Sequence, residues 1–232
     1  MTWIEARADS GSRIALVRCA IDLLHFQGIP IDAASPWTGP GRRAVRLRDG
    51  DFEGALAGVR RALEDRVTFA ALAEAPVDAQ DPLENSLFDD AFPTEAIEHT
   101  ADEAFAVIAP DRADLLAAAA EALGGLIVSP SSVRALASRP VAVSAPEPDW
   151  PEDERLHAWL AEVLYALDAG RFALRRAVIF EDSAEAVRGA IFGEPIDEER
   201  HEIHGAIKAV TYHGLAIDPV PGGLRATVIV DV

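Results

Sequence analysis

The clearest β-hairpin pattern of this chain lies in residues 201–232, HEIHGAIKAVTYHGLAIDPVPGGLRATVIVDV. Two strand-like runs, Ile207–Asp218 and Leu224–Val232, flank the turn residues Pro221-Gly222-Gly223. β-Branched runs on both sides of residues that supply positive φ predict a hairpin. The second run ends with Asp231 beside the terminal carboxylate, and two acidic groups at a strand end can supply hard oxygen ligands to a divalent cation.

Three sequence motifs, one of which contains this hairpin, form a larger pattern along the chain. The first is Glu98-His99-Thr100-Ala101-Asp102, and the second is the helical run Trp159–Tyr165. The third comprises His201-Glu202, the run Lys208–His213, the Gly-Gly turn and the terminal Val-Asp-Val. In order and spacing these motifs resemble the archease family over roughly residues 94–232, and the first 90 or so residues lie outside the resemblance.

The resemblance implies a function that is not itself a reaction. Archeases assist the RNA ligase that joins 2′,3′-cyclic phosphate or 3′-phosphate ends to 5′-hydroxyl ends, in tRNA splicing and RNA repair. They promote guanylylation of the ligase by GTP and so sustain its turnover. We therefore expect an RNA ligase protein as the partner, and an activator of an enzyme instead of an enzyme; whether the chain has a catalytic activity of its own is left open.

The resemblance also implies which residues act. It assigns a divalent metal ion, calcium or magnesium, to Asp102, Asp231 and the carboxylate of Val232. Oxygen ligands suit both ions. Five further positions match recurrent family residues and are candidates for partner binding or another functional role: His99, His201, Glu202, Lys208 and His213.

Two positions depart from the family pattern. Glu103-Ala104-Phe105 stands where the family usually has a small stretch that contains glycine, and Ala206 stands where it commonly has a glutamate. The first change predicts an altered backbone beside the metal ligands, because glycine permits conformations that alanine resists. The second removes a carboxylate that could contact the partner.

Composition limits the functions that this chain can have. The 232 residues are 50% hydrophobic and can bury a substantial core, while the net charge of −18 argues against tight direct binding to nucleic acid. The single cysteine, Cys19, lies in an apolar helical run, which predicts a buried, unreactive thiol and fits a reducing, cytoplasmic setting. The N-terminal residues lack a signal-peptide pattern, and no apolar run is long enough for a bilayer.

The pattern along the chain predicts an α+β fold in three parts. Residues 1–73 read as strand–helix–strand–strand–helix, an additional α/β module of unknown role; residues 74–93 are an acidic, proline-containing linker; and residues 94–232 form an archease-like two-layer α/β domain. Ser10–Ser12 is expected to cap the first helix, Gly124-Gly125 to end a helix, and Gly170 to follow the helix that contains Trp159.

Other interpretations remain open from the residues alone. Each histidine is more often structural than catalytic, and the arginines at positions 42, 43, 46, 48, 60 and 61 form either a solvated surface or a docking patch for a phosphate or an acidic partner. One alternative function is a metal-dependent hydrolase with Asp102 and Asp231 as ligands and His99 or His213 as base. The other is a non-catalytic scaffold whose N-terminal module binds a different partner.

Overall fold

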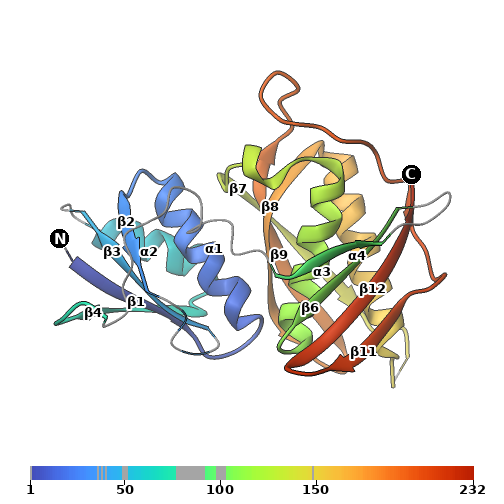
Figure 1. Cartoon of the computed structure of the whole chain (residues 1–232), viewed down its shortest axis with the longest axis horizontal. Coiled ribbons are helices and arrows are strands. Elements are labelled where there is room, and N and C mark those ends of the chain that lie inside the picture. Colours follow the sequence, from blue (N-terminus) through green and yellow to red (C-terminus); the bar gives the residue numbers. More distant parts are fainter. Residues whose placement is uncertain are drawn as a thin grey trace.

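The computed structural model describes residues 2–35, 37, 39, 41–48, 52–76, 92–97, 103–147 and 149–232. Figure 1 shows an N-terminal module, residues 2–72, beside a larger C-terminal domain, residues 92–232, with helix α1 lying between the module's sheet and the domain. In these ranges no helix is both long and apolar enough to cross a membrane.

The N-terminal module has the order βαββαβ. Its elements are β1 (Thr2–Ala8), α1 (Arg13–Phe26), β2 (Ile31–Ala34), β3 (Arg42–Leu47), α2 (Glu53–Ala62) and β4 (Val67–Leu72). The strands form an antiparallel sheet in the order β2-β3-β1-β4, the arrangement of ferredoxin-like folds. Five of these elements match the sequence pattern, but β4 was missed because its six residues alternate only weakly and precede the proline-containing region.

The C-terminal domain packs two helices between two antiparallel sheets. Its elements are β5 (Thr94–Ile97), β6 (Glu103–Ala109), α3 (Arg112–Ile127), a 3-10 turn (Pro130–Ser132), β7 (Ala137–Ser144), α4 (Glu152–Gly170), β8 (Phe172–Asp182), β9 (Ala186–Pro195), β10 (Ala209–Val210), β11 (Ala216–Val220) and β12 (Gly223–Asp231). One sheet has the strand order β10-β12-β6-β5, and β11 also pairs with β12. The other sheet has the strand order β7-β9-β8. The α+β class is confirmed, and the second sheet adds a layer that the sequence did not indicate.

The terminal hairpin is present, but its first strand is interrupted. Pro221-Gly222 connects β11 to β12, and Gly222 takes a φ of +88°, as the third residue of a type II turn requires. The expected single strand Ile207–Asp218 is wrong: β10 and β11 both pair with β12, and residues 211–215 loop out between them. Gly214 lies in this loop at a φ of +65°, a backbone conformation that interrupts a strand. The strand-like sequence pattern runs across this position and therefore did not indicate the loop.

Two glycines that were expected at helix ends belong to the helices themselves. Gly124 lies inside α3, where a Cβ would come within 2.8 Å of the Leu174 side chain. Gly170 is the last residue of α4, and a Cβ there would overlap the Arg139 guanidinium. The residue with the left-handed backbone conformation that ends the helix is Arg171, at a φ of 42°. Both helices therefore extend further than expected: α3 continues to Ile127 and α4 includes Gly170. Glycine misleads here because close packing also selects it.

The module and the domain share one continuous core. Trp159 of α4 is completely buried and donates its indole N–H to the carbonyl oxygen of Leu116, 3.0 Å away, so its place in the core is confirmed. Ser12 is the N-cap residue of α1, as expected, but its side chain makes no capping hydrogen bond; its hydroxyl oxygen accepts from the backbone N–H of Ile179 in β8, at 2.7 Å. Asp114 of α3 accepts instead from the first-turn N–H groups of Ile14 and Ala15. A helix of one unit is thus capped by a side chain of the other.

Candidate functional site

Lys208, Asp231 and Val232 come together where β12 ends. The backbone N–H of Lys208 donates to the main-chain oxygen of Asp231 at 2.8 Å, and Ala209 pairs with Asp231 in the sheet. The Lys208 ammonium donates to the main-chain oxygen of Val232 and lies 3.9 Å from Oδ1 of Asp231. Three of the expected functional residues therefore form one cluster, which we call the C-terminal corner.

The side chains of this corner face solvent. The Lys208 side chain is 70% exposed and that of Asp231 is 54% exposed. An ion pair at such exposure contributes little to stability, because water screens it and both side chains lose freedom when they pair. The carboxylate of Asp231 is consequently accessible to an external cation or partner.

The neighbouring strand places one more acidic residue at the same end of the sheet. Glu103, the first residue of β6, pairs with Val230 of β12, and its side chain is exposed. His99 and Asp102 lie outside the described residues. In the described part of the chain, no three His, Cys, Asp or Glu side chains form a cluster that could hold a metal ion. Glu103 was named from sequence only as a family departure, and strand pairing is what reveals its position.

The departure at Glu103-Ala104-Phe105 leaves the strand regular. Ala104 pairs with Ile229 and Phe105 with Val228 in unbroken antiparallel register. The described non-glycine residues with positive φ do not include these three. These three residues therefore take ordinary strand conformations that need no glycine, and the expected difference from the family's backbone stays a prediction.

His201 and Glu202 belong to another place, where the chain leaves β9. The His201 ring is fully buried; Nδ1 accepts from the backbone N–H of Asp197 at 2.9 Å, and Nε2 lies 3.4 Å from Oε1 of Glu194. Burial would raise the pKa of Glu194, but hydrogen bonds, first of all from Arg134, lower it. Glu202 has an exposed side chain, and its main-chain oxygen accepts from the N–H of Ser129. These contacts hold the 196–204 loop against the 3-10 turn.

His213 lies exposed in the loop between β10 and β11. Its neighbour Tyr212 stacks on His157 of α4, with ring centroids 3.7 Å apart and planes 11° apart. His157 also bonds the main-chain oxygen of Val210 through Nε2, at 3.0 Å. This pair fixes β10 to α4, and the sequence offered no signal for it because its members are 55 positions apart.

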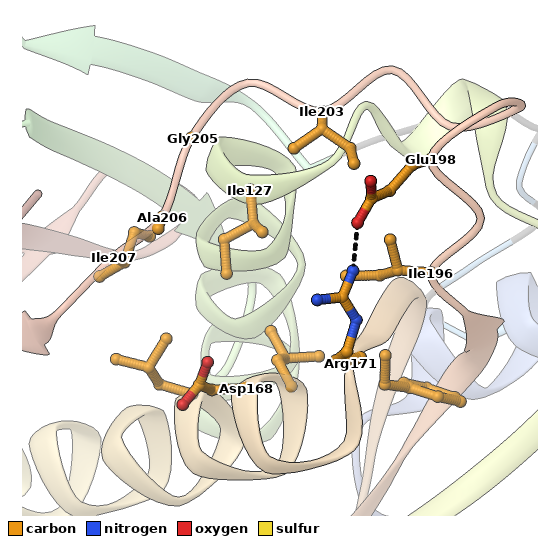
Figure 2. A pocket seen from close by; sticks show the side chains of 12 residues that line it. Ile127, Asp168, Arg171, Ile196, Glu198, Ile203, Gly205, Ala206 and Ile207 are labelled. Carbon is orange, nitrogen blue, oxygen red and sulfur yellow. Dashed lines mark hydrogen bonds and ion pairs between the residues drawn. The ribbon is translucent and has the colours of Figure 1, made fainter.

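A groove runs under the segment that leads to Lys208 (Figure 2). Its volume is about 240 Å³. Ile127, Leu164, Leu167, Phe172, Ile196, Ile203 and Ile207 supply apolar side chains to it. Arg171 and Glu198 form an ion pair at one side, and Ala206 lines the opposite side. Ala206, one of the two expected departures from the family pattern, thus lines an apolar groove with its methyl group.

The arginines of the N-terminal module are largely engaged within it. Nε of Arg46 and Nε of Arg48 lie 2.6 and 3.0 Å from the two carboxylate oxygens of Asp32. Burial would raise the pKa of Asp32, but these two arginines lower it. Arg43 is buried beneath Trp37. The arrangement favours a structural surface over a docking patch.

Comparison with known proteins shows which family the C-terminal domain resembles. Residues 95–232 match the family model described as Archease protein family (MTH1598/TM1083). The protein archease of Methanopyrus kandleri is 37% identical over 143 residues, which is 60% of this chain and 99% of that protein. The one from Methanosarcina acetivorans is 29% identical over 142 residues, 60% of this chain and 94% of that protein.

A solved structure is also similar. The solution structure of Methanobacterium thermoautotrophicum protein 1598 is 28% identical and covers 60% of this chain and 98% of that one, with a TM-score of 0.49. The family model begins at residue 95, so the N-terminal module lies outside it. The family model spans more than half of the chain, including the C-terminal corner, and the chain therefore belongs to the archease family.

Proposed function

We propose that this protein activates a GTP-dependent RNA ligase that joins 3′-phosphate ends to 5′-hydroxyl ends, by promoting guanylylation of the ligase. Membership of the archease family supports this role, and one structural observation carries it. Asp231 and Val232 stand exposed at the end of β12, beside Lys208, where a partner protein can reach them.

The corner is suited to a hard divalent cation. The described donors are carboxylate and main-chain oxygens on a rigid strand end, which is the ligand chemistry of calcium and magnesium. Asp102 is bonded to Glu103, which pairs with Val230, so we propose Asp102 as the third ligand with Asp231 and Val232. A cation held there would supply positive charge to oxygen atoms of the ligase or its nucleotide.

Charge supports a protein partner with a basic surface. Residues 74–232 contain 30 of the 39 acidic residues and 11 of the 21 basic ones. Opposite charges on two proteins speed their encounter and fix their orientation. The apolar groove that ends at Ile207 adjoins Lys208 in sequence, so a partner that engages the corner can also cover the groove.

The test is guanylylation of the ligase from the same organism, with GTP and metal, in the presence of the parent protein or its variants. Asp231→Asn is expected to abolish the stimulation while the fold is retained. Asp218→Asn is the matched control, because Asp218 is an exposed aspartate of β11 in the same hairpin.

Calorimetric titration with calcium and magnesium measures cation binding independently of ligase stimulation. Asp102→Asn and Asp231→Asn should each weaken cation binding, and Asp218→Asn should not. If the parent stimulates the ligase and Asp231→Asn stimulates it equally, the corner has no part in activation. If the folded parent gives no stimulation at all, the proposed function is wrong.

A further inference from the structure

The apolar groove of the C-terminal domain adjoins the C-terminal corner (Figure 2). Ile203 and Ile207 line it, and the ammonium of the next residue, Lys208, donates to the main-chain oxygen of Val232. Ile203 and Val232 are 45% and 41% exposed. One segment therefore leads from the groove to the corner, so a protein that reaches the corner can cover both.

The groove has the size and the walls to receive an apolar side chain. Its volume of about 240 Å³ is smaller than the roughly 300–1,000 Å³ of pockets that enclose drug-sized ligands. Leu164 and Leu167 of α4 and Phe172 of β8 line it and belong to the buried core, so its shape is held by packing. Preformed pockets that take one side chain of the partner are typical of the centres of protein–protein interfaces.

The rim of the groove is acidic. The segment 196–207, which forms one side, contains four acidic residues and one arginine. That arginine, Arg200, lies 2.8 Å from the buried carboxylate of Glu194. Asp168, in the last turn of α4, adds an exposed acidic residue from the opposite side. Arg171, beside it, forms an ion pair with a glutamate of the segment. The rim therefore favours a positively charged partner.

We propose that the groove receives an apolar side chain, flanked by basic residues, from the surface of the RNA ligase, an inference that rests on the proposed function. The apolar side chain enters the groove, and the basic residues on either side of it lie over the acidic rim. The apolar contact supplies affinity, and the opposite charges orient the segment. The groove then anchors the ligase, while the adjoining corner presents its carboxylates to it.

Binding of the ligase from the same organism is measured by calorimetry, alongside the stimulation of its guanylylation. Ile203→Asn puts a polar amide at an exposed position of the groove. It should weaken ligase binding by about tenfold or more, the effect of losing one buried aliphatic side chain from an interface. Leu136→Asn is the matched control, because Leu136 is also an exposed aliphatic residue, at 54%, but does not line the groove.

Asp168→Lys tests the acidic rim without weakening the fold, because a cation in the last turn of a helix interacts favourably with the helix dipole. It should weaken ligase binding, and the remaining affinity should depend less on KCl concentration than that of the parent. The control is Glu185→Lys, which reverses an exposed charge in the turn between β8 and β9, at the other end of that hairpin from Phe172.

Equal ligase affinity in the parent and Ile203→Asn, or an equal loss in Leu136→Asn, would overturn the groove as the anchor even if the parent stimulates the ligase. Unchanged affinity in Asp168→Lys would overturn a basic segment as the occupant. A parent that binds the ligase through the groove without stimulating it would overturn the proposed activation alone, and one that does neither would overturn both. A dimer of the parent that Ile203→Asn abolishes in sedimentation velocity would show a second copy in the groove and overturn the proposal.

Discussion

Two clusters of charged side chains in this protein have opposite environments. At the module junction, Asp22 and Arg175 have side chains 1% and 5% exposed and lie 2.9 Å apart. At the C-terminal corner, Asp231 and Lys208 are 54% and 70% exposed and lie 3.9 Å apart. The buried pair joins α1 of the module to β8 of the domain, whereas the exposed ions are accessible from outside. Both clusters contain the same kinds of side chain, so their burial decides which charges are structural and which are available to a binding partner.

The largest effect is expected from Asp22→Ala at the junction. Removing this acid leaves Arg175 and Arg176 buried without their shared carboxylate, and breaking a buried pair costs about 3–5 kcal/mol. Urea denaturation measures the loss of unfolding free energy. The control is Glu181→Gln, which removes an exposed partner of Arg188 and should change little. Equal behaviour of the two variants would contradict the contrast between buried and exposed charges.

A pH-dependent effect is expected from Asp114, which caps α1 across the junction. Burial raises the pKa of Asp114 from 3.8 to about 6, against the backbone hydrogen bonds from Ala15 and Ile14 that lower it. Between these values the native state binds more protons than the unfolded chain, so the free energy of unfolding decreases as pH rises. The decrease is roughly 3 kcal/mol for a shift of two units.

Asp114→Asn keeps an oxygen acceptor for the α1 N-terminus but cannot ionise. The difference between the parent's and the variant's unfolding free energies, measured from pH 3.5 to 7, should therefore change across the window from about 4 to 6 and be flat above it. Other carboxylates titrate equally in both proteins and cancel. Parallel curves for the two proteins would show that Asp114 does not titrate in this window.

The sequence predicted the parts of this protein that depend on periodic patterns. The buried face of α4, with Trp159 at its centre, and the Pro-Gly turn of the hairpin follow from spacing and turn chemistry. The buried junction does not, because its ion pairs join residues of α1, α3 and β8 that are as much as 154 positions apart. The family motif named Asp231 and Lys208, which lie close together at the surface, and His201, whose burial depends on loop contacts that no linear pattern shows.

The smallest effect on stability is expected from Lys208→Met at the C-terminal corner. Its ion pair is exposed, so the unfolding free energy should change by less than about 1 kcal/mol. If Asp231 belongs to a cation site, the ammonium of Lys208 competes with the cation for the same carboxylate. The variant should then bind calcium or magnesium more tightly than the parent in calorimetry. A large loss of unfolding free energy would show that the Lys208 ion pair stabilises the fold as the buried pairs do. Unchanged cation affinity would show that Lys208 does not compete with a cation for Asp231.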